Sequence, residues 1–255
     1  MHQWWASSGN LHGRTLVALA SASAFLLAAC GGQSEPSADT SAPEASETST
    51  SSTPPSPPTP APVTAAQLPG LLPTLDELKT ITDNPQLVEG PNSTGVAEPD
   101  PSQQVYEPAN CASSFSAGAP PAYEGTGYRK FHGASQAQSP TPSLMLGESV
   151  VTFDTAEAAQ RALANYVEQW RRCANTQFVW KMIAQGQQAA FTLGEPIDAG
   201  GGVTSLRNVN DNSPVTVTRA IAAKNNVLVD VQLMGSNLTE QNVTIANRIL
   251  EKIPN

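Results

Sequence analysis

The clearest hydrophobic pattern in the chain is a helical stripe within residues 156–173. Its apolar positions are Ala159, Leu163, Tyr166, Trp170 and Cys173. They recur at intervals of four, three, four and three residues, which places them on one face of an α-helix. Residues 154–157, Asp-Thr-Ala-Glu, are a capping signal in front of this stripe. The pattern therefore predicts a helix that turns the Cys173 side chain toward the core.

Two apolar stretches, 215–223 and 227–234, predict a β-hairpin around Asn225-Asn226. Asparagine tolerates positive φ, so we expect a two-residue type I′ turn that sets Val227 opposite Lys224. The face predicted to point into the core holds Ala220, Ala222, Val227, Val229, Val231 and Leu233. The other face holds Val217, Arg219, Ile221, Leu228, Asp230, Gln232 and Met234, with Arg219 diagonal to Asp230.

Weaker patterns complete the predicted globular part. Thr74 and Glu77 form a capping box for a helix ending near residue 82, and a last helix is expected over 238–253 with Asn237 as its cap. Strands are expected around 128–131 and over 144–153, whereas 84–110, rich in Gly, Pro, Asn and Asp, is expected to be a long loop. The elements predict an α+β fold, with a mostly antiparallel twisted sheet packed by helices.

The amino terminus has the pattern of an export signal. The apolar run 16–28 is 13 residues long, whereas a membrane-spanning helix needs about 20. Residues 27–30, Leu-Ala-Ala-Cys, match the lipobox of bacterial lipoproteins, in which the cysteine thiol accepts a diacylglyceryl group. We therefore expect a signal peptide over 1–29 and lipidation at Cys30; an ordinary secretory signal with an incidental cysteine is the alternative. Two or three acyl chains, palmitate among them, would anchor the chain to the extracytoplasmic face of the cell membrane.

Composition divides the rest of the chain into two parts. Residues 30–66 are almost entirely Ser, Thr, Pro, Ala, Gly and Glu after the cysteine, which predicts a disordered tether. Residues 67–255 have the apolar content of a globular domain, and their length suits one core.

The remaining cysteines, Cys111 and Cys173, are expected to form a disulfide. With Cys30 lipidated they are the only two thiols, and an exported domain lies in an oxidising compartment. A catalytic or metal-binding pair is the competing interpretation, which the lack of a C-x-x-C pattern and of a second nearby histidine disfavours.

Charge and motif content argue against several functions. A net charge of -9 is unsuited to nucleic-acid binding through a general field. His132 is the one histidine of the expected mature chain, and Gly133-Ala-Ser-Gln-Ala137 resembles a nucleophile elbow without the required strand-to-helix turn. We therefore expect no enzyme activity, metal or cofactor.

The layout of residues 68–254 resembles the PknH-like extracellular sensor domain. That module lies outside the membrane in a mycobacterial receptor serine/threonine kinase and also occurs alone in actinobacterial lipoproteins. The resemblance rests on Leu72-Pro73, Cys111, Gly127-Tyr128, the 153–173 segment with Trp170, Arg219-Ala220 and 225–231.

The resemblance implies an antiparallel sheet backed by helices around a deep cleft, two disulfides, and binding of an unidentified extracellular ligand. Cys111 and Cys173 match the first disulfide pair of the family. Val217 and Met234 stand where the second pair is expected, and the hairpin register places these two residues opposite each other. An apolar contact in place of a covalent bond implies lower stability at that end of the hairpin.

Arg219 and Asp230 are the candidate ligand-cleft residues, with the guanidinium binding an anionic group. An ordinary cross-strand ion pair is the alternative, and we favour it. The leading functional hypothesis is a non-enzymatic module that binds a small-molecule or envelope ligand and acts with a signalling protein. A lipid or glycolipid carrier, which would need a large apolar cavity, is the alternative, and a hydrolase is the least favoured.

Overall fold

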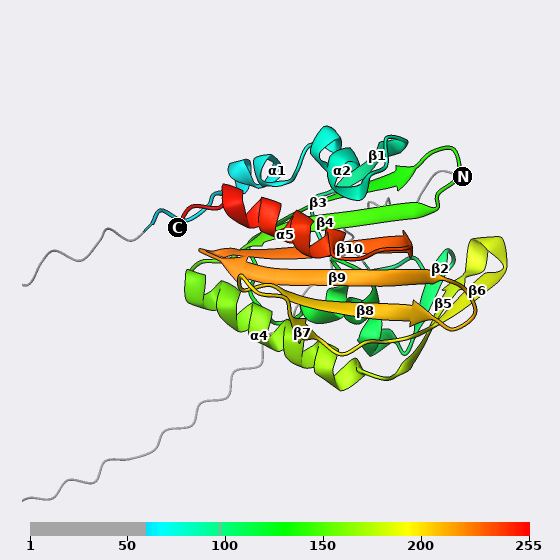
Figure 1. The fold of residues 1–255 in the computed structure, drawn as a ribbon. Coiled ribbons are helices and arrows are strands. Elements are labelled where there is room, and N and C mark those ends of the chain that lie inside the picture. Colours follow the sequence, from blue (N-terminus) through cyan, green and yellow to red (C-terminus); the bar gives the residue numbers. More distant parts are fainter. Residues whose placement is uncertain (1–59, 97) are drawn as a thin grey trace, which may run out of the picture. The chain divides into compact units, whose positions relative to one another are not determined.

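A computed structural model describes residues 60–96 and 98–255. Their strands form one 10-stranded sheet in the order β1-β3-β4-β10-β9-β8-β6-β5-β2, with β7 paired to β8 (Figure 1). Every strand pairing is antiparallel, which confirms the predicted fold class. The strands are β1 Leu87–Ser93, β2 Gln104–Glu107, β3 Lys130–Gln138, β4 Leu144–Thr152, β5 Gln177–Met182, β6 Gln187–Thr192, β7 Ile197–Asp198, β8 Thr204–Asn210, β9 Val215–Lys224 and β10 Val227–Ser236.

Helices cover both faces of this sheet. In Figure 1, α1 and α2 are grouped with α5, and α4 lies apart from them across the sheet. One core cluster joins α1, α2 and α5 to β4, β9 and β10, and a second joins α4 to the opposite face of the same strands. The α-helices are α1 Leu68–Leu71, α2 Leu75–Thr82, α3 Ala112–Phe115, α4 Ala156–Cys173 and α5 Gln241–Lys252.

The two locally encoded helices form as predicted. At α2 the Thr74 hydroxyl accepts from the Glu77 N–H, and the Glu77 carboxylate accepts from the Thr74 N–H at 2.8 Å. At α4 the cap is Thr155, whose side chain accepts from the Ala158 N–H. The predicted apolar stripe of α4 is buried, apart from Leu163, which is partly buried.

The β9–β10 hairpin has the predicted register but a different turn. Val227 lies opposite Lys224, and Met234 lies opposite Val217. Only Asn225 has positive φ, at 50°, so the turn is not of type I′. The expectation that one face of the hairpin lies outside the core is wrong, because α3, α4 and the segment between β2 and β3 cover that face as well.

Two element boundaries also differ from the sequence prediction. Residues 84–110 contain β1 and β2, which pair with β3 and β5, and are not one long loop. Gly90 of β1 lies close to β3, since a Cβ there would lie 2.7 Å from the Ser135 hydroxyl oxygen. The last helix begins at Gln241, and Asn237 takes φ 61° before it and does not cap it.

Candidate functional site

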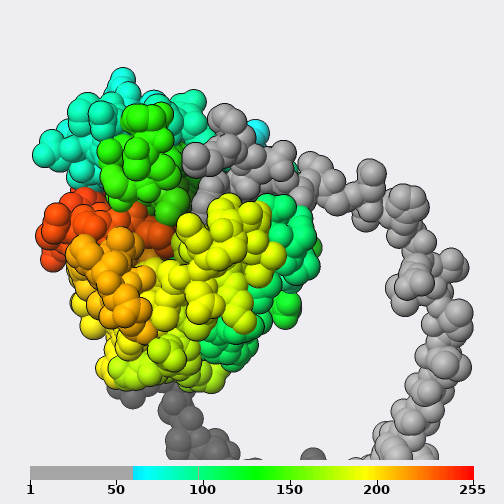
Figure 2. Space-filling model, turned by 90° about the vertical axis from the view of Figure 1, so that its right-hand side faces the viewer, coloured from blue at the N-terminus to red at the C-terminus, as the bar shows by residue number. Residues whose placement is uncertain are grey.

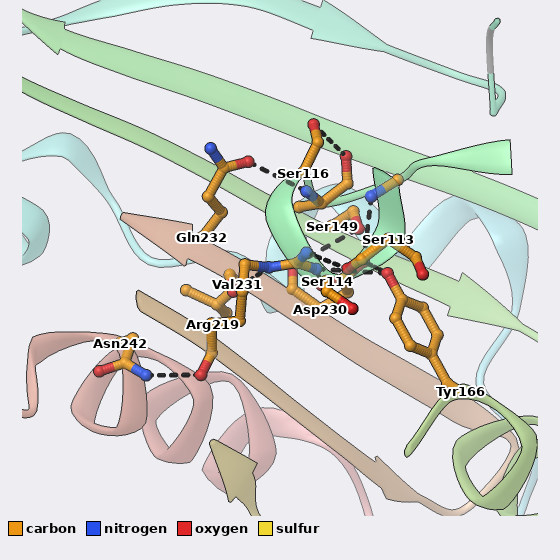
Figure 3. Close-up of polar contacts among 12 residues, drawn as sticks. Ser113, Ser114, Ser116, Ser149, Tyr166, Arg219, Asp230, Val231, Gln232 and Asn242 are labelled. Atoms are coloured by element: carbon orange, nitrogen blue, oxygen red, sulfur yellow. Dashed lines mark hydrogen bonds and ion pairs between the residues drawn. The ribbon is translucent and has the colours of Figure 1, made fainter. Parts of the chain in front are cut away.

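The predicted pair Arg219 and Asp230 lies at the centre of a closed polar network (Figure 3). Both side chains are 0% exposed and form an ion pair. The guanidinium of Arg219 also donates to the backbone oxygens of Ser113 and Val231, and to the Tyr166 hydroxyl at 3.2 Å. Arg219 lies 5.4 Å from the centre of the Trp170 ring, which adds a cation–π contact.

The Asp230 carboxylate is equally well bound. Its Oδ2 atom accepts from the Tyr123 and Tyr166 hydroxyls, both at 2.9 Å, and from the Gly118 N–H at 3.0 Å. Gly118 takes φ 68°, a conformation that glycine adopts without strain, and so presents its N–H to the carboxylate. Burial and the neighbouring Asp230 charge raise the pKa of Tyr123 well above its usual value, so this hydroxyl stays a donor. Burial lowers the pKa of Arg219, but Asp230 and Tyr166 together outweigh this effect, and the pKa of the guanidinium is raised.

This network holds residues 112–123 against the sheet. Ser113, Gly118 and Tyr123 each bind Arg219 or Asp230, and the Ala117 N–H donates to Gln232 on β10. The two candidate residues therefore do not line an opening in this structure. The pair is also not the ordinary exposed cross-strand ion pair that the sequence favoured. Removing one partner of a buried pair leaves an uncompensated charge, so this pair matters more to stability than an exposed one. Ligand contact at Arg219 and Asp230 stays a prediction.

The disulfide between Cys111 and Cys173 is present, as the sequence predicts. It joins the start of the 112–123 segment to the last residue of α4, and the Trp170 indole N–H donates to the Ser113 oxygen at 2.9 Å beside it. Val217 and Met234 are buried in the same cluster as the disulfide. Figure 2 shows this end of the molecule, where the yellow β5–β6 region lies beside the green-cyan segment that includes β2.

An open groove of about 610 Å³ lies between α2 and α5. Arg248 on α5 crosses it and pairs with Glu77 at 2.6 Å and with Glu251 at 2.9 Å. The Thr74 N–H and the Arg248 guanidinium lower the pKa of Glu77 to about 2. The groove is lined by Asp76, Glu77, Thr80, Ile81, Thr244, Asn247, Arg248 and Glu251.

The residues considered for catalysis do not form a catalytic arrangement. Gly133 to Ala137 lie inside β3, so they lack the strand-to-helix turn of a nucleophile elbow. His132 is on the same strand and is half-buried, and burial lowers its pKa. Within the described residues, no group of three or more His, Cys, Asp or Glu could hold a metal ion.

The predicted anchor cannot be placed in the structure. Cys30, the signal peptide and most of the tether lie outside the described residues. Among the helices that are described, none is long and apolar enough to cross a membrane.

Comparison with known proteins identifies the class of domain. The family model of the PknH-like extracellular domain matches residues 63–252, so the chain belongs to that family. Domains of this family are extracellular sensor domains of kinases. The crystal structure of the extracellular domain of PknH from Mycobacterium tuberculosis has the same fold, with a TM-score of 0.68 and 21% identity over 75% of this chain and 97% of that chain.

Two curated relatives are mycobacterial kinases. The serine/threonine-protein kinase PknJ of Mycobacterium tuberculosis is 32% identical over 205 residues, which are 75% of this chain and 33% of the kinase. The kinase PknH of the same species is 23% identical over 193 residues, 75% of this chain and 30% of the kinase. The chain thus spans about a third of the length of these relatives.

Sequence reasoning found the central pair of the network but missed its partners. The register of the hairpin was enough to set Arg219 diagonal to Asp230. Tyr166 lies on the predicted inner stripe of α4, and a buried tyrosine hydroxyl usually needs a hydrogen-bond partner, so this residue carried a usable signal. Ser113, Gly118 and Tyr123 lie in a segment without a periodic pattern, and no such signal pointed to them.

Proposed function

We propose that this chain is a non-enzymatic sensor module that binds an envelope ligand while held at the extracytoplasmic face of the membrane through a lipid on Cys30. The family match over residues 63–252 carries this proposal, since the matched family is an extracellular domain. The 27–30 lipobox pattern supplies the anchor. A separate signalling protein is the partner that would relay the occupied state.

The groove between α2 and α5 is the ligand surface that we favour. Every residue that lines it except Ile81 has a charged or polar group at its end, and such groups can fix a polar ligand. Asn247 is exposed in it and presents an amide that can both donate and accept hydrogen bonds. The alternative of a lipid or glycolipid carrier gains no support from a groove of this character.

Metabolic labelling with a fatty-acid analogue tests the anchor. The full-length protein should take up the label and partition with membranes, and the Cys30→Ser variant should do neither. Label that persists in the variant would reject lipidation at this residue.

Native mass spectrometry of the protein purified from its own cells tests ligand binding. We expect a retained small molecule that is lost in Asn247→Arg, which fills the groove, and kept in Asn212→Arg, which changes an exposed turn away from it. If the protein retains nothing, or if both variants retain the same mass, the groove is not the ligand surface.

A further inference from the structure

Glu148 and Gln136 are a buried polar pair on the face of the sheet beneath α1, α2 and α5. Glu148 on β4 lies opposite Ala134 of β3, so Gln136 is its diagonal neighbour on the same face. The two side chains belong to residues that are 2% and 7% exposed. Neighbouring positions of β4 on this face, Leu146 and Val150, belong to the apolar core that includes α1, α2 and α5.

This pair has an excess of acceptors in its hydrogen bonding. The Gln136 amide donates to Oε1 of Glu148 at 3.4 Å. Oε2 of Glu148 and Oε1 of Gln136 are both buried without a hydrogen-bond partner. Two buried acceptors without donors are costly, but a proton on Oε2 would turn that atom into a donor that the Gln136 oxygen can accept. The result is a cyclic acid–amide pair with two hydrogen bonds.

No neighbouring cation takes the place of that proton. The charged groups that influence Glu148 from the helical layer are Lys252 on α5 and Glu77 on α2. The Lys252 ammonium donates to the Leu72 oxygen at 2.8 Å and lies 3.5 Å from Glu77, so its charge is already engaged. His132 occupies the other diagonal position on β3, and α1, with the sequence Leu-Pro-Gly-Leu, contributes no charge.

We propose that Glu148 is a proton-binding site: its carboxylic acid is neutral in the folded protein, pairs with Gln136, and on losing its proton loosens the packing of α1, α2 and α5 on the sheet. This inference is independent of the proposed ligand and its groove. Burial is the main cause that raises the pKa of Glu148, to about 8 from an ordinary 4.5, in agreement with this geometry.

The direction of the pH effect follows from the two protonation states. The folded chain holds the proton more tightly than the unfolded chain, so this contribution to stability is complete below pH 4.5 and is lost as the pH rises toward about 8. Across the steep part of this window, the unfolding equilibrium constant should rise about tenfold per pH unit relative to a chain without the group.

Urea unfolding of the full domain as a function of pH tests the proposal. Glu148→Gln mimics the neutral acid, so its stability should not fall over this window, and the difference between wild type and variant should grow with pH. Glu89→Gln changes an exposed carboxylate on the neighbouring strand β1 and should follow the wild type. Parallel profiles for wild type and Glu148→Gln would overturn the proposal.

A second measurement follows the proton on Glu148 in the folded wild-type protein and uses Glu148→Gln only to assign the resonance. In an NMR titration of carbon-13-labelled glutamate carboxyl groups, the resonance that disappears in Glu148→Gln should titrate well above the ordinary range. A midpoint within the ordinary range would mean that Glu148 is charged and that water or another group satisfies its oxygens, and the proposal would be rejected.

Discussion

The carboxamide of Asn226 binds the backbone of Val63 at both its N–H and its C=O. Oδ1 of Asn226 accepts from the Val63 N–H at 2.8 Å, and Nδ2 donates to the Val63 oxygen at 3.1 Å and to the Phe153 oxygen at 2.9 Å. Val63 is 4% exposed although it precedes the expected domain start at residue 67. The turn of the β9–β10 hairpin therefore fastens the entry of the chain into the domain.

Replacing Asn226 by Ala should release this entry segment. The Val63 N–H would lose a buried partner, which costs about 1–3 kcal/mol of unfolding free energy. Limited proteolysis should cut near residues 60–64 faster than in the wild type. The exposed turn variant Asn212→Ala serves as the control, and equal cleavage in all three proteins would show that Asn226 does not hold the segment.

Removing one residue of the buried ion pair should destabilise the domain more than removing both. Arg219→Met should lower the free energy of unfolding by about 3–5 kcal/mol, because it leaves the Asp230 charge buried without its partner. Adding Asp230→Leu removes that charge and should restore part of the loss. Denaturant unfolding of the single and double variants measures both effects.

The exposed pair of Arg129 and Asp154 is a matched control for this cycle. Its side chains are 61% and 60% exposed, so Arg129→Met should lower the free energy of unfolding far less than Arg219→Met. If Arg219→Met costs no more than Arg129→Met, the network does not hold residues 112–123 on the sheet.

The disulfide should be a large part of the stability of this domain. Cys111 and Cys173 are separated by 62 residues, and closing such a loop stabilises the folded state by about 4 kcal/mol in the chain-entropy model. We expect the double variant Cys111→Ala/Cys173→Ala to unfold at much lower denaturant concentration. Mass spectrometry without reduction should find the two peptides joined in the wild type, and free thiols at both positions would contradict the pairing.

Local sequence signals were sufficient for the parts of the fold that depend on neighbours in the chain. The capping box at Thr74, the stripe of α4 and the register around Asn225 each rest on short-range geometry, and all three are present. The predicted I′ turn is absent: Asn226 lacks the required positive φ, and its side chain bonds Val63 and Phe153, a long-range contact that no short window of sequence shows.

The sequence did not reveal which faces and strands are covered by segments far away in the chain. The face that carries Arg219 and Asp230 looks like an outer face by alternation, but residues 112–123 and α4 cover it. The edge strand β1 contains Gly90 and Pro91, residues typical of loops, and its pairing with β3 was missed for that reason. Glu148 gave no signal because an isolated carboxylate in a strand is normally expected at the surface.

The lowered pKa of Glu77 predicts that the domain also loses stability in acid. The Thr74 N–H and Arg248 hold the pKa of Glu77 at about 2, below the ordinary 4.5, so its contribution is present above pH 4.5 and is lost as the pH falls toward 2. Glu77→Gln should lower stability at neutral pH and flatten this acid limb in denaturant unfolding. Glu124→Gln, which changes an exposed carboxylate, should leave the limb unchanged; an equal response in both variants would rule out a special role for Glu77.

Val217 and Met234 should accept a second disulfide. They lie opposite each other in the hairpin and are 0% and 7% exposed. Counting outward from the turn, they form a non-hydrogen-bonded pair, in which facing side chains approach most closely.

In Val217→Cys/Met234→Cys, a bridge closing a loop of about 17 residues should stabilise the domain by about 3 kcal/mol. Thermal unfolding before and after reduction measures the gain within one protein, and Val217→Cys alone controls for the lost apolar contact. Free thiols in the oxidised double variant would mean that the two positions are not equivalent to the second cysteine pair of the family.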